Sequence, residues 1–540
     1  MKNAFLYSWI SGSLLLLFSC TRNFDNINTD PTKANPGNFD PNYLFTTAQL
    51  GYGNVTEYQL YELSCMTQQL SSSFDYYGGG DKYNQQLTAY NSRFFTDGFN
   101  LAGQLTEAQS LGLSKDATQY NNLIQMSRIM RVLVMQRITD LYGDVPYSEA
   151  GQAKLGLIYP KYDKQADIYQ DMLTTLDDAI GKLDATKPLV TGDLLYNGDI
   201  GKWKKFGYSI MLRVAMRIIK SAPALAQQYA EKAAGKTFAD VSDNAVLKLD
   251  GGPNDATINR TANAIRLNDF QQLRWSNTLI NYLVANNDPR LYVLSEKADT
   301  GLAFNDDLSH PGLLYTTQKP APQGFVNEVP RGMPNGYDLS GAYGIDKAPG
   351  YPGVTGTSDN ASPLGNYARP RLAVFTKQNL PVFLITYAQT ELLLAEAKAR
   401  GWNVGSTGAA QHFQNGVNGA LQALPDWDAA LTVKADSITH FLSRHVLDGS
   451  TLEKSLQMIN SEYWVASLFD FAEAWSNWRR SNYPVLTPVH YPGSMTNNTI
   501  PRRLPYPATE NANNPVGFRA ALQRLGGNDL PGLRVWWDKE

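Results

Sequence analysis

The sequence is poor in cysteine, with Cys20 and Cys65 the only two among 540 residues. A disulfide framework of the kind that stabilises small secreted domains is therefore excluded, and one Cys20–Cys65 bridge is the only pairing possible. The chain also lacks an excess of either charge, because the formal net charge is −3 and no long run of like charges occurs. Since nucleic-acid binding requires a basic surface, we expect no nucleic-acid partner.

Enzyme and metal signatures are missing as well. The chain has no Gly-x-Ser-x-Gly elbow, no phosphate-binding P-loop and no His-Glu-x-x-His pair. Its five histidines are scattered, and the closest two, His440 and His445, are five residues apart, which is off the spacing of one helix face. We expect no catalytic residues, no metal site and no cofactor. A structural calcium ion in the acidic loops stays open, although no EF-hand spacing is present.

Long apolar runs are confined to the N-terminus. Lys2 precedes an apolar stretch that ends in Leu17-Phe18-Ser19-Cys20, the order of parts of a secretion signal. These four residues resemble the bacterial lipobox, so residues 1–19 are predicted to be a lipoprotein signal peptide and Cys20 the lipidated residue. The alternative is a retained transmembrane helix, but Ser11-Gly12-Ser13 interrupts the stretch before it reaches the length of a bilayer span.

After Cys20 the composition changes twice. Residues 20–40 are rich in Asn, Asp, Thr and Pro and read as a lipidated tether that cannot bury enough apolar surface to order itself. Residues 41–540 can build a substantial core, because hydrophobic residues make up 43% of the chain. Within them, about 241–380 is rich in Gly, Pro, Asn and Asp, which predicts long loops of the kind that usually carry function.

Helical periodicity dominates the rest of the chain. Apolar residues recur every three to four positions, which predicts amphipathic helices over 119–141, 164–183, 203–218, 383–399 and 461–480. Pro223 marks the start of a following helix, and Trp203-x-x-Phe206-Gly207 resembles the opening of a tetratricopeptide repeat. We therefore predict a mainly α fold, built as a tetratricopeptide-repeat-like scaffold of helical hairpins with a loop-rich, ligand-binding excursion.

Aromatic residues are abundant, with 30 Tyr and 10 Trp. A flat apolar ring with a polar edge suits stacking on a sugar ring or on peptide side chains. The strongest candidate is the stretch from Ser71 to Tyr83, where three consecutive glycines predict a loop, and its proposed ligand contacts are Tyr76, Tyr77, Asp81 and Tyr83. The alternative is that these tyrosines pack back onto the body of the protein.

A second candidate is the stretch Asn259–Asn281, in which amide and guanidinium groups could bind hydroxyls. Its proposed ligand contacts are Arg274 and Trp275, at the start of an expected helix, although Trp275 could instead anchor that helix to the core. By contrast, Trp464, Trp475 and Trp478 share helical spacing with Phe469 and Phe471 and are assigned to the core.

Several ordered motifs resemble one family along the whole chain. They are Asn28-x-Asp30-Pro31-x-x-Ala34, Asp140-Leu141-Tyr142-Gly143-Asp144-Val145-Pro146-Tyr147, Asn287-Asp288-Pro289-Arg290-Leu291, Tyr387-Ala388-Gln389-x-Glu391-x-x-x-Ala395-Glu396-Ala397, Trp475-x-x-Trp478-Arg479-Arg480-x-x-Tyr483-Pro484, Ile500-Pro501-Arg502-Arg503-Leu504-Pro505-Tyr506-Pro507, and Val535-Trp536-Trp537-Asp538-Lys539. Together they resemble the SusD/RagB outer-membrane nutrient-binding lipoproteins. We expect these residues to define turns and core packing rather than to contact the nutrient.

The resemblance implies a lipid-anchored, surface-exposed protein of the cell outer membrane. It implies a partner, a SusC-like TonB-dependent barrel transporter, over which the chain opens and closes as a lid to deliver an oligosaccharide or a peptide. It does not assign ligand residues, because those of the family lie in variable loops. A surface glycoside hydrolase, whose carboxylate pair sequence alone does not reveal, and an adhesin remain the alternatives.

Overall fold

The computed structural model describes residues 39–54, 56–84, 88–153, 156–297, 330–355 and 362–540. The chain divides into two compact units, Met1–Pro41 and Asn42–Glu540, and the second carries the structure described below. The signal peptide (1–19), Cys20 and nearly all of the tether (20–40) lie outside the described residues, so lipidation at Cys20 stays a prediction. None of the described helices is both long enough and apolar enough to cross a membrane.

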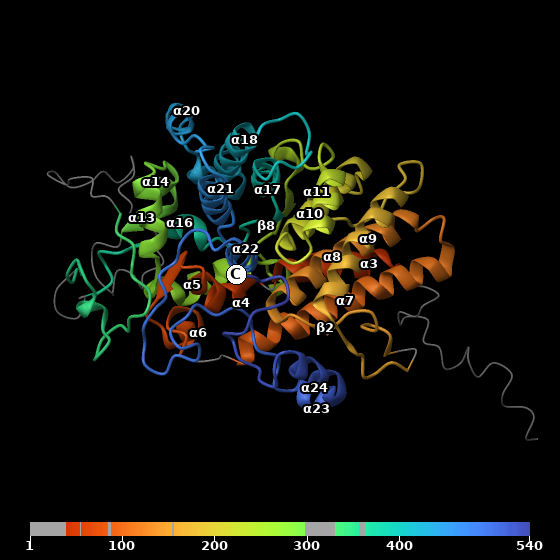
Figure 1. Ribbon diagram of the computed structural model, residues 1–540, viewed down its shortest axis with the longest axis horizontal. Helices are drawn as coiled ribbons and strands as arrows, with labels where there is room; N and C mark the ends of the chain where they lie inside the picture. The colour runs from red at the N-terminus through yellow and green to blue at the C-terminus, as the bar shows by residue number, and fades with distance from the viewer. Residues whose placement is uncertain (1–38, 55, 85–87, 154–155, 298–329, 356–361) are drawn as a thin grey trace, which may run out of the picture. The chain divides into compact units, whose positions relative to one another are not determined.

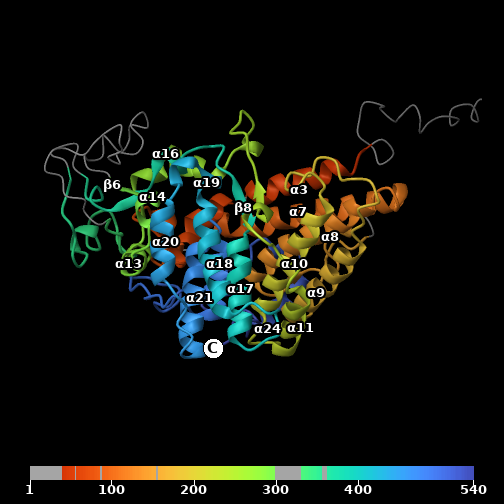
Figure 2. The same ribbon diagram turned by 90° about the horizontal axis from the view of Figure 1, so that it is seen from above.

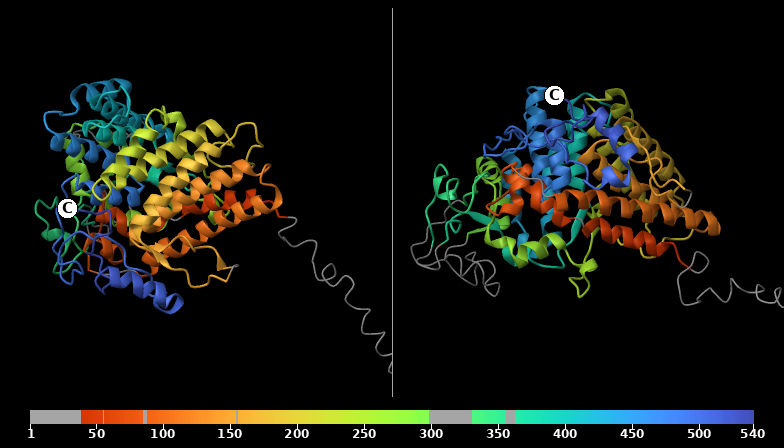
Figure 3. Two further views of the ribbon diagram at one scale, coloured as in Figure 1. Left: turned by 45° about the vertical axis from the view of Figure 1, so that its right-hand side comes forward. Right: turned by 90° about the horizontal axis from the view of Figure 1, so that it is seen from below.

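An array of antiparallel helices forms the first part of the scaffold (Figures 1 and 3). Each helix packs against the next in the order α3 (Asn42–Asn54), α7 (Thr88–Asp116), α8 (Asn121–Tyr142), α9 (Gln165–Lys182), α10 (Ile200–Arg217) and α11 (Pro223–Ala233). The helices predicted over 119–141, 164–183 and 203–218 are confirmed, and Pro223 is the first residue of its helix.

Gly207 explains how closely two of these helices approach. A Cβ atom at Gly207 of α10 would lie 2.6 Å from Cγ1 of Ile180 in α9, so only a glycine fits there without displacing that side chain. Trp203 and Phe206, about one turn apart in this motif, are fully buried, and the indole N–H of Trp203 donates to Asp193 at 2.7 Å. The Trp-x-x-Phe-Gly motif thus packs a helical hairpin.

A second helical array continues the scaffold. α17 (Tyr387–Ala399) packs against α18 (Ala409–Gln422), α21 (Leu452–Ala466) and α10, and α21 packs in turn against α22 (Phe471–Ser481). Viewed from above, this teal and blue array lies beside the orange and yellow one (Figure 2). The predicted mainly α, tetratricopeptide-repeat-like fold is confirmed. Trp464, Trp475, Trp478 and Phe471 are buried in its core, as predicted.

Two predicted helices are wrong in their bounds. The expected helix over 461–480 is two helices, because α21 ends at Ala466, α22 starts at Phe471, and Phe469 between them has φ +65°. The helix expected from 383 begins at Tyr387, since Phe383 belongs to strand β8 (Val382–Ile385). There Thr386 starts the helix with a capping box, accepting from the amide of Gln389 while its own amide donates to the Gln389 side chain.

The region 241–380 holds more regular structure than predicted. Its short elements are β4 (Ala245–Leu247), α12 (Arg260–Leu267), β5 (Leu273–Trp275), α13 (Asn277–Ala285), α14 (Arg290–Leu294), β6 (Ser295–Lys297), β7 (Ala368–Pro370) and α16 (Leu372–Phe375). The antiparallel pairs are β1 (Leu70–Ser72) with β5, β2 (Val145–Pro146) with β3 (Tyr162–Asp163), β4 with β8, and β6 with β7. Residues 298–329 lie outside the described part of the chain.

The motifs quoted above meet inside the scaffold. Arg480 donates twice to the buried carboxylate of Glu396, at 2.8 and 2.7 Å, which joins the Trp-x-x-Trp-Arg-Arg motif of α22 to the late helix α17. Arg503 donates to the carbonyl oxygen of Tyr142 at 3.1 Å, and the hydroxyl of Tyr506 donates to that of Asp144 at 2.6 Å. These motifs therefore hold distant segments together, as expected of residues that define the fold.

Candidate functional site

The two candidate stretches, Ser71–Tyr83 and Asn259–Asn281, form one site. Strand β1 pairs with β5 so that Ser71 lies opposite Arg274 and Leu70 opposite Trp275. Just beyond the strands, the hydroxyls of both Tyr76 and Tyr77 donate to the carboxylate of Asp269, the latter at 2.9 Å. Some 190 residues of chain separate these partners, so neither stretch by itself predicts the pairing.

Five half-buried aromatic rings gather at this junction, and we call them the aromatic surface: Tyr58, Tyr61, Phe74, Tyr76 and Tyr90. Phe74 stacks on Tyr76 with ring centroids 4.9 Å apart, Tyr76 meets Tyr61 edge to face at 5.7 Å, and Tyr61 lies 4.5 Å from Tyr90. Partly exposed rings that pack on one another in this way offer apolar ring surface to solvent.

Local backbone structure positions these rings. Tyr61 belongs to a π-helical turn, Gln59–Leu63, and such turns in helices occur often at functional sites. Tyr76 belongs to a 3₁₀ turn, Asp75–Tyr77, whose next residues form the short helix α6 (Gly78–Asp81). The predicted loop at the three glycines is therefore wrong. A Cβ atom at Gly80 would lie 2.0 Å from the carbonyl oxygen of Glu62, so glycine there permits contact with the π-helical turn.

Polar groups border the aromatic surface. The exposed side chain of Asn268 donates to the hydroxyl of Tyr76 at 3.1 Å, and Arg260 forms an ion pair with Glu57 at 3.6 Å. Burial raises the pKa of Asp269 to about 6, against the opposing effect of the hydrogen bonds from Tyr76 and Tyr77. Rings bordered by hydroxyl, amide and charged groups can stack on an apolar face of a ligand while hydrogen-bonding its polar edge.

The other predicted contacts are buried in the described structure. They are Tyr77, Asp81, Tyr83, Arg274 and Trp275, each at most 2% exposed. Asp81 accepts hydrogen bonds from the side chain of Asn335 at 2.7 Å and the amide of Gly336 at 2.8 Å, so it fixes a distant loop. Arg274 donates to backbone carbonyls, including that of Leu364 at 3.1 Å. Trp275 packs edge to face on Phe375 and Phe469, each at 6.1 Å, and direct ligand contact by any of the five stays an untested prediction.

A polar groove opens at the other end of β5. Its volume is about 450 Å³, within the range of small-molecule sites, and it is lined by Asn277, Asn281, Arg331 and Tyr367, among others. The two asparagines lie within the stretch whose amides were expected to bind hydroxyls, whereas Arg331 and Tyr367 carried no signal in the sequence. They reach the groove because the amide of Asn277 donates to the carbonyl of Met333 at 2.8 Å and holds the loop there.

The described residues hold no group of three or more His, Cys, Asp or Glu side chains placed to bind a metal ion. His445 instead contacts the carboxylate of Glu462 at 2.9 Å, and His412 contacts Glu391 at the same distance. A structural calcium ion stays a prediction.

Comparison with known proteins decides the family. The model of a SusD-like family, described as "Starch-binding associating with outer membrane", matches residues 33–309 and 340–507. The chain belongs to this SusD-like family. The resemblance inferred from the motifs is thereby confirmed, and with it the family's association with the outer membrane.

Solved structures of SusD-like proteins share the fold. One described as a chitin-binding protein is 29% identical, with a TM-score of 0.77, and the match covers 93% of this chain and 100% of that one. A Bacteroidetes SusD-like protein gives a TM-score of 0.77 at 24% identity, and a chitin-binding SusD homologue from Flavobacterium johnsoniae gives 0.70 at 21%. Both matches cover 93% of this chain, and they cover 100% of the Bacteroidetes chain and 99% of the Flavobacterium johnsoniae chain. No curated protein matches the chain.

Proposed function

We propose that this SusD-like protein binds an oligosaccharide at the aromatic surface and passes it to a TonB-dependent transporter of the SusC type. The observation that carries the proposal is the aromatic surface, where five supported rings are partly open to solvent and bordered by polar groups. Sugar rings have apolar faces rimmed by hydroxyls, so such a surface can stack on them and hydrogen-bond their edges.

Binding without chemistry agrees best with this arrangement. A glycoside hydrolase places two carboxyl groups about 5 to 10 Å apart on either side of the bond it cleaves. At the aromatic surface the buried carboxylate, Asp269, is already engaged by the hydroxyls of Tyr76 and Tyr77. A hydrolase would lose its rate on removal of one carboxylate, whereas a binding protein requires saturable affinity alone.

The ligand class is tested by calorimetric titration with chito-, malto- and cello-oligosaccharides and with short peptides. Chito-oligosaccharides come first, because two of the SusD-like structures similar to this chain are described as chitin-binding. We expect one class of oligosaccharide to bind and Phe74→Ala and Tyr61→Ala to remove about 1 to 3 kcal/mol of its binding free energy. Tyr292→Ala, a 61% exposed tyrosine on α14 outside the aromatic surface, is the control and should leave binding unchanged.

The transporter partner and the membrane anchor require a different experiment. The full chain is purified with an affinity tag from gently solubilised outer membrane, and the proteins that accompany it are identified by mass. We expect a stoichiometric TonB-dependent barrel, and a Cys20→Ala variant that is released from the membrane fraction. Repeated absence of the barrel would favour a free-standing adhesin, and hydrolysis of any bound oligosaccharide would favour the enzyme.

A further inference from the structure

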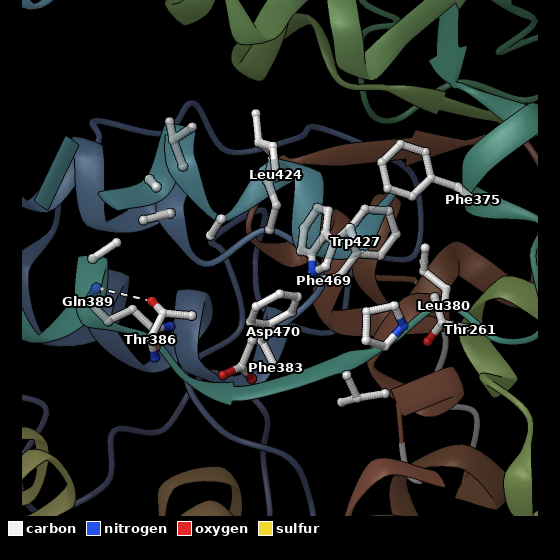
Figure 4. A pocket seen from close by; sticks show the side chains of 18 of the residues that line it. Thr261, Phe375, Leu380, Phe383, Thr386, Gln389, Leu424, Trp427, Phe469 and Asp470 are labelled. Atoms are coloured by element: carbon white, nitrogen blue, oxygen red, sulfur yellow. Dashed lines mark hydrogen bonds between the residues drawn. The ribbon is translucent and has the colours of Figure 1, made fainter. Parts of the chain in front are cut away.

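An apolar cavity lies between β8 and the ends of α17, α18 and α21, and the start of α12 also lines it (Figure 4). Its volume is about 70 Å³. One wall consists of small side chains, Ala388, Ala420, Ala423 and Ala466, and another consists of aromatic rings. The cavity exceeds the roughly 10–15 Å³ that one water molecule needs but is about half the roughly 150 Å³ of an apolar cavity that binds benzene, so its occupant is at most one small ring.

The aromatic wall is a packed cluster with defined geometry. Phe469 stacks on Phe375 with centroids 4.7 Å apart, and Trp427 meets Phe469 edge to face at 5.4 Å. The ring of Phe383 in β8 also packs edge to face against Trp427, with ring centroids 5.6 Å apart. Because these rings support one another, the cavity does not simply collapse, and a planar ring that enters it gains aromatic contacts.

The break between α21 and α22 builds this wall. Phe469 has φ +65°, a left-handed conformation that is costly for a bulky residue, of order 1–3 kcal/mol. This conformation ends one helix, starts the next and places the Phe469 ring on Trp427 and Phe375. A continuous helix over 461–480, which the apolar periodicity favours, would remove the break. Backbone strain of this kind is concentrated where proteins clamp ligands.

One carboxylate lies at the polar end of the cavity, beside Thr386 and Gln389 (Figure 4). Asp470 caps α22 by accepting from the amide of Glu473 at 3.4 Å. It also lines a second cavity of about 20 Å³ together with Arg137, Arg213 and Glu473, so the charges of two arginines act on it. The other charged group at the apolar cavity, Arg290, is engaged by Asp288 and Glu462.

We propose that this cavity is a second binding site, for a small neutral aromatic molecule that carries one hydrogen-bond donor, such as a phenol. The aromatic and alanine walls take the ring, and Asp470 accepts from the donor. The charges of Arg137 and Arg213 near that carboxylate oppose a cationic ligand, and Asp470 repels an anionic one. Its lining residues differ from those of the aromatic surface, and the proposal does not depend on the proposed function.

The test uses ¹⁹F NMR titration of the full chain with four probes of similar size. 4-Fluorophenol supplies the ring and the donor, 4-fluoroanisole lacks the donor, 4-fluorobenzylamine is cationic and 4-fluorobenzoate is anionic. We expect saturable binding of 4-fluorophenol and roughly tenfold or greater weakening for the anisole, because hydrogen bonds to charged groups contribute most of the polar affinity. The benzylamine and the benzoate should bind more weakly than the phenol.

Two variants locate the site. Ala420→Leu fills the cavity from α18 and should abolish binding, whereas Ala410→Leu places the same side chain on an exposed position of that helix and should leave it unchanged. Asp470→Asn retains a good helix cap and should bring the affinity for the phenol close to that for the anisole. Thermal unfolding checks that each variant is folded, and Ala466→Val replaces Ala420→Leu if that variant is not.

Each outcome decides the proposal. Binding of 4-fluorophenol that is lost in Ala420→Leu and kept in Ala410→Leu supports it. Failure of all four probes to bind, or binding that survives filling of the cavity, overturns it. Equal affinity for the phenol, the anisole and the benzylamine overturns the role of Asp470 and reduces the cavity to an unspecific apolar gap. Oligosaccharide titrations of Ala420→Leu, expected to match the unchanged chain, show separately whether the aromatic surface works.

Discussion

The helical scaffold and the ligand-facing junction of β1 and β5 satisfy their buried carboxylates in opposite ways. In the scaffold, Glu396 is held by Arg480 and Arg400, and Glu462 by Arg290 and His445. At the junction, Asp81 and Asp269 accept hydrogen bonds from amides and hydroxyls. Arginine partners hold the pKa of Glu396 and Glu462 at about 2, whereas burial raises the pKa of Asp81 and brings that of Asp269 to about 6.

This difference indicates how the chain combines a rigid scaffold with a site whose contacts can rearrange. A buried ion pair fixes two helices at one geometry, and removal of either partner leaves an uncompensated charge. A carboxylate held by neutral donors costs less to rearrange, because protonation or exchange of one donor is enough to release it. Tyr76 and Tyr77 are attached to Asp269 in this second way, as ligand-binding segments are expected to be.

The largest effect is expected in the scaffold. Arg480→Met leaves the carboxylate of Glu396 buried with one partner and should lower the free energy of unfolding by about 3 to 5 kcal/mol at pH 7, measured by urea denaturation. Arg400→Met, whose side chain is 24% exposed, should cost no more than about 1 kcal/mol. Since the folded pKa of Glu396 is lowered to about 2, its stabilising contribution is present above pH 4.5 and is lost as pH falls towards 2. Equal losses in the two variants would contradict the comparison.

The next largest effect is expected at Asp470, whose contribution to stability depends on pH with the opposite sign to that of Glu396. Burial raises its pKa to about 6, so its contribution to stability is complete below pH 3.8 and is lost as pH rises through 6. The unchanged chain should therefore lose up to about 3 kcal/mol relative to Asp470→Asn between pH 4 and pH 7.

Chemical denaturation across this pH range measures the difference. Asp428→Asn is the matched control, because hydrogen bonding and the charge of Lys377 lower the pKa of Asp428. The difference in free energy of unfolding between Asp428→Asn and the unchanged chain should not show this change between pH 4 and pH 7. A pH-independent effect of Asp470→Asn would show that the carboxylate is not desolvated.

At the ligand-facing junction, Asp81→Ala should cost about 1 to 3 kcal/mol, because it leaves buried donors of Ser71 and Asn335 without an acceptor. The loss should be local, and hydrogen exchange should accelerate at residues 335–338 before the scaffold amides respond. Asp255→Ala, which removes an exposed carboxylate, should change stability by less than about 0.5 kcal/mol. Loss of protection throughout the helices would show that Asp81 belongs to the scaffold instead.

The smallest effect is expected at the aromatic surface, where two substitutions distinguish the contribution of the Tyr76 ring from that of its hydroxyl. Tyr76→Phe removes the hydrogen bond to Asp269 but keeps the ring on Phe74, so stability should fall by about 1 kcal/mol or less. Oligosaccharide affinity should stay close to that of the unchanged chain if stacking dominates, whereas Tyr76→Ala should weaken it clearly. Calorimetry with the oligosaccharide that binds best measures both, and equal losses would assign the contact to the hydroxyl.

Sequence reasoning succeeded where the signal is local. The 3.6-residue period predicted α8, α9 and α10 nearly residue by residue, since one buried face per helix is enough to produce it. It failed at residues 461–480, where Trp464, Phe471 and Trp475 keep the period through a real break in the helix. Phe469 and Asp470 end and restart the helix through tertiary packing and capping, which hydrophobic periodicity does not record.

The candidate site shows the same division. Tyr76 was singled out as an aromatic residue in an unusual polar context; the structure places it on the half-buried surface, and its contact with a ligand stays a prediction. Tyr58, Tyr61 and Tyr90 were missed, because inside helical segments they look like ordinary core residues. Asp81, Arg274 and Trp275 were chosen for their chemistry, but burial is decided by the strands that cover them.

The sequence by itself determined the family, the helical class and the stretches that carry aromatic chemistry, because motif order, periodicity and composition are properties of the chain alone. Tertiary structure decided which of those stretches meet. The pairing of β1 with β5, the convergence of five rings and the cavity at the break before α22 all join residues far apart in the chain. Such contacts depend on long-range packing and hydrogen bonding, whose partners no local pattern specifies.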